Sequence, residues 1–223
     1  AFTTGSTAKE VVFDMWNTNS SASSDYGRIT IELTGASVGS PFRITAQSGT
    51  SGIFQQAIGN DLTTSTLEDF KHYAVVFENS GSTFVTKLYV DGKLNDTNYR
   101  VGAVNEINSK NLAARIGSLI SSPSGSTAEA GWGKMSASLD EFRFWKASRN
   151  PQEISQHWFT QVYGGTNSDV SNSTLGVYYK FNEGIVGSAS VDSVILDYSG
   201  RVTNGAWTGY SAGSRTTDSA III

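Results

Sequence analysis

The sequence predicts a single all-β sandwich with one short helix, and three features point to this fold class. Polar and apolar residues alternate in many short stretches, as in residues 28–33 and 83–90, and such alternation is typical of strands with one buried face. Turn-forming residues separate these stretches at intervals of about ten residues, as in β-sandwiches. One segment, residues 148–159, carries the start signals of a helix.

The composition excludes several classes of protein. At 223 residues the chain can bury a core without a metal or disulfide, and the absence of cysteine rules out thiol catalysis and zinc-thiolate sites. With a net charge of −4 and no Lys/Arg cluster, nucleic-acid binding has little electrostatic support. No apolar run is long enough to span a bilayer, so we expect no membrane insertion.

The composition also favours a location. The chain is rich in serine, threonine and glycine, and only 16% of its residues are charged. This composition fits an extracellular, cell-surface or virion protein. Because the chain begins at Ala1 without methionine, we expect it to be a processed form or a fragment of a larger protein.

Four strands are expected in the first part of the chain. Residues 11–16 form a mostly apolar run that includes two aromatic residues, and we expect a strand there. The small polar residues after it predict a loop. Residues 28–33 and 42–46 alternate strictly, and residues 52–58 form a further short strand.

The clearest local signal is a meander of strands at residues 72–77, 83–90 and 93–94. Residues 78–82 form the first predicted turn, and Asp91-Gly92 forms the second. An Asp-Gly pair between alternating residues is typical of a two-residue hairpin, because both turn positions need positive φ. We therefore expect antiparallel pairing throughout this region.

The one predicted helix begins near Asn150. Pro151 stands at the first helical position, and Glu153 follows Asn150 by three residues, which is the spacing of a capping box. Ile154 and Trp158 are four residues apart and so would share the face directed at a sheet. Further strands are expected at residues 113–117, 136–145 and 177–181, with a short apolar run at residues 194–196.

Two of these segments resemble a known family. Residues 72–94, ending in Leu-Tyr-Val-Asp-Gly-Lys-Leu, are similar to a hairpin of the laminin G-like, pentraxin-like group. Residues 139–154 are similar to that group's closing strand and helix. The group belongs to the concanavalin A-like lectin/glucanase superfamily, and the resemblance implies a jelly-roll β-sandwich.

A third segment resembles the family in a different order. Residues 177–205 are similar to the group's opening strand and turn, yet here they come last. Either the domain is circularly permuted, or the chain is cut from a tandem array whose next repeat begins here. We therefore expect a sandwich over residues 1–163, a polar connector over 164–174, and a segment over 175–223 that completes the sandwich or begins another.

Glucanase chemistry is not expected. Glucanases of this superfamily carry three acidic residues on one strand, spaced so that their carboxylates enter one groove. The comparable strand here has Ser138 and Arg143 at the outer acidic positions, with Asp140 between them. The chain is therefore predicted to have no catalytic residues.

The resemblance implies one structural Ca²⁺. In related jelly rolls such an ion ties the first strand to the last through carboxylates and loop carbonyls. The positions of this sequence that match are Asp140, Glu183 and the Gly184 carbonyl, with Asp197 as a further candidate. The alternative is that Asp140 binds backbone at a strand start and that Asp197 only makes an Asx-turn.

The favoured function is a non-catalytic binding module, adhesive or carbohydrate-binding. Exposed aromatic residues would contact the glycan, and the candidates are Tyr99, Trp132, Trp207 and Tyr210. The alternative is a structural module of a phage or bacterial surface protein, whose partners are neighbouring protein chains in an oligomer or tandem array. An assembly module needs an unpaired strand edge or a large apolar patch.

Overall fold

The computed structural model describes residues 2, 10–34, 39–106, 109–121, 133–162, 173–183 and 194–207. The chain divides into two compact units, Ala1–Ala137 and Ser138–Ile223. The first unit contains two antiparallel sheets. The second contains two short strand pairs and a helix.

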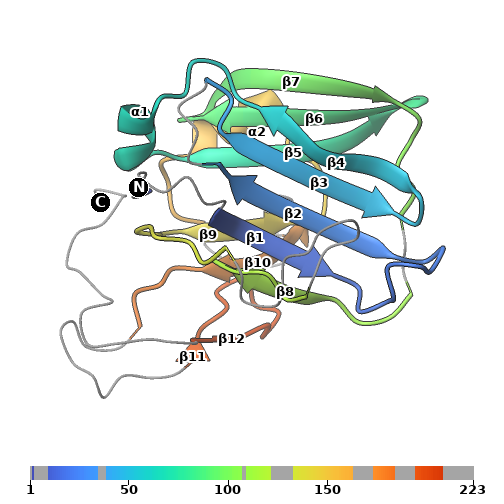
Figure 1. The fold of residues 1–223 in the computed structure, drawn as a ribbon. Helices are drawn as coiled ribbons and strands as arrows, with labels where there is room; N and C mark the ends of the chain where they lie inside the picture. The colour runs from blue at the N-terminus through green and yellow to red at the C-terminus, as the bar shows by residue number, and fades with distance from the viewer. Residues whose placement is uncertain are drawn as a thin grey trace. The chain divides into compact units, whose positions relative to one another are not determined.

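The larger sheet of the first unit has five strands in the order β4-β3-β2-β1-β8, and every neighbouring pair is antiparallel (Figure 1). Its strands are β1 (Glu10–Trp16), β2 (Gly27–Leu33), β3 (Phe42–Ser48), β4 (Ser51–Ile58) and β8 (Ala113–Ile116). All five strands were predicted, with bounds that differ by a residue or two at their ends.

The smaller sheet is the predicted meander, β5 (Tyr73–Ser80), β6 (Thr83–Val90) and β7 (Lys93–Val101). Asp91 and Gly92 have φ values of 47° and 74°, which confirms the two-residue hairpin. The first turn is tighter than predicted. Strand β5 continues to Ser80, because Gly81 at φ 60° reverses the chain within two residues.

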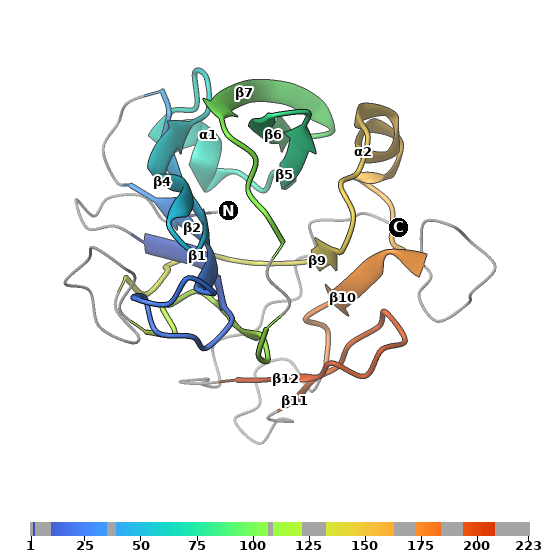
Figure 2. The same cartoon turned by 90° about the vertical axis from the view of Figure 1, so that its right-hand side faces the viewer.

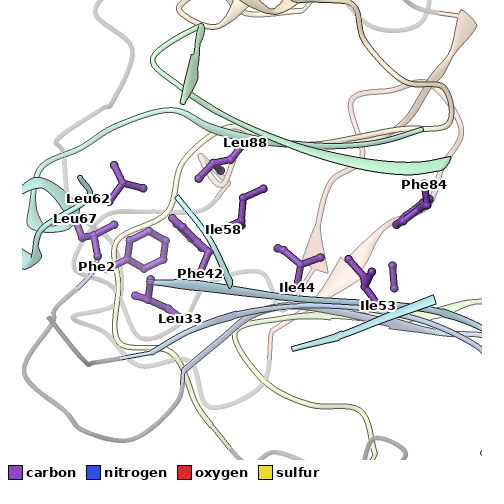
Figure 3. Close-up of a cluster of buried hydrophobic side chains, with 11 residues drawn as sticks. Phe2, Leu33, Phe42, Ile44, Ile53, Ile58, Leu62, Leu67, Phe84 and Leu88 are labelled. Atoms are coloured by element: carbon purple, nitrogen blue, oxygen red, sulfur yellow. The ribbon is translucent and has the colours of Figure 1, made fainter. Parts of the chain in front are cut away.

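The core lies between these two sheets (Figure 2). Figure 3 shows Ile44 and Ile53 pointing from the five-stranded sheet towards β6, which contributes Phe84 and Leu88. The buried members of this core are Phe2, Leu33, Phe42, Ile44, Ala46, Ile53, Ile58, Leu62, Leu67, Phe84 and Leu88. Since successive side chains of a strand point to opposite faces, the residues between these core positions lie on the other side of the sheet.

The expectation of a single helix was wrong, because the first unit has a short helix of its own, α1 (Thr64–Glu68). Thr63 is its N-cap and accepts a hydrogen bond from the Thr66 backbone N–H at 3.4 Å. Leu67 anchors the helix in the core with 2% of its surface exposed. A helix of five residues is too short to produce an apolar periodicity, which is why sequence patterning missed it.

The second unit contains the predicted helix, α2 (Pro151–His157). Its capping box is confirmed. The Glu153 backbone N–H donates to Asn150 Oδ1 at 2.8 Å, and the Asn150 N–H donates to Glu153 Oε2 at 2.8 Å. At the other end, the Arg143 guanidinium donates to the backbone carbonyls of His157 and Thr160 and so satisfies acceptors that a helix end leaves open.

Two strand pairs complete this unit: β9 (Phe142–Trp145) with β10 (Leu175–Tyr179), and β11 (Val194–Ile195) with β12 (Gly205–Ala206). Strand β9 begins later than the predicted residue 136, and Glu141 just before it has φ 56°. Strand β12 was not expected. Pairing of β10 with β9 joins the segment after residue 175 to the predicted first domain, and the boundary between units falls at 137/138. That this segment completes the sandwich stays a prediction, as does circular permutation.

Candidate functional site

The side of the five-stranded sheet that faces away from the core is polar, and we call it the outer polar face. Its members alternate with core residues along β1 to β4, and they are Asp14, Arg28, Thr30, Glu32, Arg43, Thr45, Gln47 and Gln55. Register places them in rows across the strands. Thr30 lies opposite both Asp14 and Thr45, and Glu32 lies opposite Arg43.

One end of this face, over β1 and β2, is filled by a buried ion pair. Arg28 donates to Asp14 through two parallel hydrogen bonds, Nε to Oδ1 at 2.8 Å and Nη2 to Oδ2 at 2.6 Å. Asp14 also accepts from the Thr30 hydroxyl at 2.9 Å and from the Ile120 backbone N–H at 2.8 Å. Both carboxylate oxygens of Asp14 therefore have two donors each.

The segment after β8 covers this ion pair. Ser121 accepts from Arg28 twice, through its hydroxyl at 3.0 Å and its carbonyl at 2.8 Å. Neither charged side chain has any exposed surface. A buried ion pair is tolerated only when its remaining donors and acceptors are satisfied, as they are here. We call this part of the outer polar face the closed end.

The other end, over β3 and β4, is shaped by a β-bulge. Ile44 pairs with Gln56 and Ala46 with Ile53, so Phe54 and Gln55 together lie opposite Thr45. Gln55 adopts φ 46°, and its backbone N–H donates to the Thr45 hydroxyl at 3.1 Å. The bulge turns the Gln55 side chain onto the outer polar face, where its amide donates to Glu32 Oε2 at 3.3 Å.

Strand register places one aromatic side chain and two amide side chains at this end. Ile53 points into the core, so the next side chain, Phe54, points outward, and it is 46% exposed. Gln47 and Gln55 are half-buried beside it, and Gln47 Oε1 has no hydrogen-bond partner among the described residues. Arg43 borders the same area. We call this part of the outer polar face the open end.

The predicted calcium ligands lie in the second unit, where Asp197 is fully occupied by the protein itself. Its Oδ1 accepts from the backbone N–H groups of Tyr178 and Ser199 at 3.0 and 2.9 Å. Its Oδ2 accepts from the Ser199 hydroxyl and the Thr203 N–H, both at 2.9 Å. Burial raises the pKa of the Asp197 carboxyl, but these hydrogen bonds outweigh burial and hold the pKa below its ordinary value.

Glu183 is a different kind of carboxylate. It is 7% exposed, its Oε1 accepts from the Leu196 backbone N–H at 3.0 Å, and its Oε2 has no partner among the described residues. Asp140 is half-buried just before β9, and Gly184 lies outside the described residues. Within the described parts of the chain, no three His, Asp or Glu side chains lie close enough together to hold a metal. Calcium binding stays a prediction.

Of the four predicted glycan contacts, two can be located. Tyr99 lies on β7 opposite Val85 and is 70% exposed. Trp207 follows β12 and is half-buried, with its ring 5.8 Å from that of Phe181. These two residues belong to different units, and the structure defines no shared site for them. Trp132 and Tyr210 lie outside the described residues.

Sequence reasoning missed the outer polar face as a site. The alternating residues of β2 indicate a strand with one solvated face, yet Arg28, Thr30 and Glu32 are all buried. One signal was available: Asp14 interrupts an otherwise apolar run in β1, and such a carboxylate needs a partner. The open end gave no comparable signal, because the bulge that presents Phe54 depends on strand pairing.

Comparisons with known proteins agree with this architecture. A laminin G family model, described as "Concanavalin A-like lectin/glucanases superfamily", matches residues 3–155 of the chain. The chain belongs to this superfamily. The match includes both sheets of the first unit, and it continues through β9 into α2 of the second.

One solved structure resembles this member of the superfamily in fold. It is a crystal structure described as a "putative carbohydrate binding protein" from Bacteroides ovatus, with a TM-score of 0.50 and 18% sequence identity. The alignment covers 92% of this chain and 54% of that protein, so the chain spans about half of its length. Among curated proteins none matches the chain. In the described residues no helix has the length and apolar character needed to cross a bilayer.

Proposed function

We propose that this chain is a non-catalytic carbohydrate-binding module and that the open end of the outer polar face binds the glycan. The observation that carries the proposal is the exposed Phe54 ring beside the amides of Gln47 and Gln55. A sugar has an apolar C–H face and a rim of hydroxyl groups. An aromatic ring complements the first, and amide, guanidinium and carboxylate groups complement the second.

The unpartnered acceptor of Gln47 supports the same assignment. A buried carbonyl oxygen without a donor costs about 1–3 kcal/mol. Rotation of this amide towards a sugar hydroxyl would supply the missing donor. The bulge at Phe54 and Gln55 further supports the proposal, because bulges re-aim side chains at functional places on a sheet.

A non-catalytic role fits the state of the carboxylates on this face. The superfamily includes glucanases, and glycoside hydrolysis needs one carboxyl group that can exchange a proton and a second that can act as base or nucleophile. All four acceptor positions of Asp14 are used by Arg28, Thr30 and Ile120, so this carboxylate is not free to serve either role. Glu32 is 4% exposed and accepts from Gln55.

A glycan array of wild type and two phenylalanine variants tests the proposal. Phe54→Ala should lose at least about tenfold in affinity, which corresponds to about 1.4 kcal/mol of ring contact. Phe70→Ala is the matched control, because Phe70 belongs to the same unit and is 44% exposed. Equal binding by both variants, or a blank array with the folded wild type, would rule out this site.

A structural Ca²⁺ in the second unit is a separate proposal, and Glu183 supports it. A buried carboxylate oxygen without a donor is a fitting ligand for a hard cation. Asp197 does not support it, because its oxygens are already occupied. Calcium should raise the thermal midpoint of the wild type at micromolar to millimolar concentration, and Glu183→Gln should remove the shift. An unchanged midpoint in the wild type would reject the ion.

One observation favours the second candidate function, an assembly module. Strand β7 is an edge of its sheet among the described strands, and it exposes Leu94, Tyr99 and Val101 by 54%, 70% and 87%. Exposed apolar residues on an edge strand favour contact with a neighbouring protein chain. Either function suits an extracellular, cell-surface or virion setting. Concentration-dependent sedimentation that disappears in a Tyr99→Lys variant would support assembly.

A further inference from the structure

We infer that the open end selects neutral glycans over acidic ones. This inference rests on the proposed function and adds the chemical class of the ligand. It comes from the charges on the outer polar face: Arg28 is paired with Asp14, and Arg43 on β3, next to the strand of Phe54, lies opposite Glu32.

The open end contains one charged residue, Arg43, and a residue of opposite charge, Glu32, borders it on the neighbouring strand β2. Glu32 on β2 lies directly opposite Arg43 on β3, on the same face of the sheet. Side chains at directly opposite positions have Cβ atoms about 5 Å apart, so each charge lies within the field of the other. A sulfated or carboxylated sugar that approached Arg43 would also approach Glu32.

Arg43 is also restrained in its reach. Its Nη1 donates to the backbone carbonyls of Ser40 at 2.6 Å and Phe42 at 3.0 Å, which holds the guanidinium at the start of β3. Recognition of a carboxylate or sulfate by arginine is strongest with two parallel hydrogen bonds from an unrestrained fork. The amides of Gln47 and Gln55 are neutral, and they suit hydroxyl groups as both donors and acceptors.

Charges elsewhere on the face do not change this balance. Arg28 is neutralised by Asp14, and neither is exposed. Arg115 lies opposite Asp14 on β8, where it is exposed and donates to the Leu119 carbonyl at 3.0 Å. Strand β8 is three strands from β3, which at about 4.8 Å per strand is about 14 Å and exceeds the Debye length of about 8 Å at physiological salt. The net charge of the chain, −4, disfavours polyanions further.

The test compares binding of the folded chain to neutral and acidic polysaccharides at two ionic strengths. Neutral β-glucan, mannan and galactan form one arm, and heparin, polygalacturonate and polysialic acid form the other. We expect binding in the neutral arm only. Its affinity should change less than about twofold between about 0.01 M and 1 M salt, where the Debye length falls from about 30 to 3 Å.

A charge variant sharpens the test. Glu32→Gln keeps the shape of the side chain but leaves Arg43 uncompensated, so the ratio of acidic to neutral binding should rise about threefold or more. Glu68→Gln removes the same charge from α1, away from this face, and should leave the ratio unchanged. The ratio is the readout because a general loss of binding cancels in it.

The outcomes separate the inference from the proposed function. Tighter binding of an acidic polysaccharide that weakens steeply with salt, and that needs Phe54, would overturn the inference and leave the carbohydrate module standing. Equal ratios in Glu32→Gln and Glu68→Gln would overturn the charge argument. Absence of binding in both arms would overturn the proposed function and the inference with it. Neutral binding that is lost in Phe54→Ala and retained in Phe70→Ala would support both.

Discussion

The closed and open ends of the outer polar face lie on the same sheet and use similar side chains, but they differ in how their polar atoms are satisfied. At the closed end, Asp14 accepts four hydrogen bonds, and Arg28 donates to Asp14 and Ser121. At the open end, Gln47 has an acceptor without a donor, and Phe54 is 46% exposed. The polar atoms of one face are therefore satisfied within the protein where they are covered, and at the open end, where they are not, we propose that they bind a ligand.

Coverage decides which role each residue takes. Ile120 and Ser121 follow β8 and lie over β1 and β2, so the charges beneath them are removed from water and must be paired. Over β3 and β4, no such segment is described, and the bulge turns Phe54 and Gln55 onto the outer polar face. Substitutions at the closed end should therefore affect the free energy of unfolding, and substitutions at the open end should affect glycan affinity.

The largest effect is expected at Asp14. Asp14→Ala leaves the Arg28 guanidinium buried without its counter-charge, which should lower the free energy of unfolding by about 3–5 kcal/mol. Urea denaturation followed by circular dichroism measures this directly. A loss below about 1 kcal/mol would contradict the view that the closed end is structural.

A double variant separates the net contribution of the Asp14–Arg28 ion pair to stability from the destabilisation caused by leaving one charge unpaired. Replacing both partners, Asp14→Leu with Arg28→Met, removes the uncompensated charge and should recover most of the stability lost in Asp14→Ala. If the double variant is as unstable as the single one, the hydrogen bonds to Thr30, Ile120 and Ser121 carry the stability instead of the ion pair.

The next effect is expected at Asp197, which resembles Asp14 in accepting four hydrogen bonds but lies in the second unit. Asp197→Ala should cost about 2–3 kcal/mol, because donors from Tyr178, Ser199 and Thr203 lose their acceptor. Hydrogen exchange at the Tyr178 and Thr203 amides reports the local loss. Unchanged protection at both amides would show that Asp197 does not tie β10 to the turn.

The lowered pKa of Asp197 fixes the direction of a pH effect. A carboxyl whose folded pKa lies below its ordinary value of 3.8 stabilises the fold above that value, and this stabilisation is lost as the pH falls through the folded pKa. Acid should therefore destabilise the second unit more in the wild type than in Asp197→Asn. Parallel pH curves for the two proteins would contradict this assignment.

At the open end, substitutions of Gln55 should separate effects on stability from effects on glycan affinity. Gln55 holds φ 46°, a conformation that costs a non-glycine residue about 1 kcal/mol or more. Gln55→Gly relieves this strain and should leave the free energy of unfolding unchanged or slightly raised, while glycan affinity falls about fivefold through loss of the amide. Gln55→Ala is the control, because it loses the amide and keeps the strain. A large drop in stability in Gln55→Gly would mean that the contact with Glu32 supports the fold.

The sequence predicted the parts of this molecule that depend on local chemistry. An apolar run located β1, and alternation located β2 and β3. Asp91-Gly92 located the hairpin between β6 and β7, and Asn150 with Glu153 located the start of α2. Each of these signals is complete within a few residues. The sequence also led to the superfamily, because the hairpin and the closing segment keep recognisable residues in the expected order.

The candidate site could not be predicted in the same way. Burial of Arg28 depends on a segment about ninety residues later, and the outward turn of Gln55 depends on its pairing with β3. The exposure of Phe54 likewise depends on the bulge in β4, which the residues around Phe54 do not reveal. Tyr99 was recognised as exposed, but exposure alone did not show which sheet or face it belongs to.

The smallest effect is expected at Tyr99, which belongs to neither end of the outer polar face. It lies on β7, in the three-stranded sheet, and is 70% exposed, so Tyr99→Ser should change the free energy of unfolding by less than about 0.5 kcal/mol. Glycan affinity should also stay unchanged, since the open end lies on the outer side of the other sheet. Titration of the preferred neutral glycan against both proteins measures this. A marked loss of affinity in Tyr99→Ser, with Phe54→Ala unaffected, would move the binding site from the five-stranded sheet to β7, and with it the distinction between a covered and an open end would lose its functional meaning.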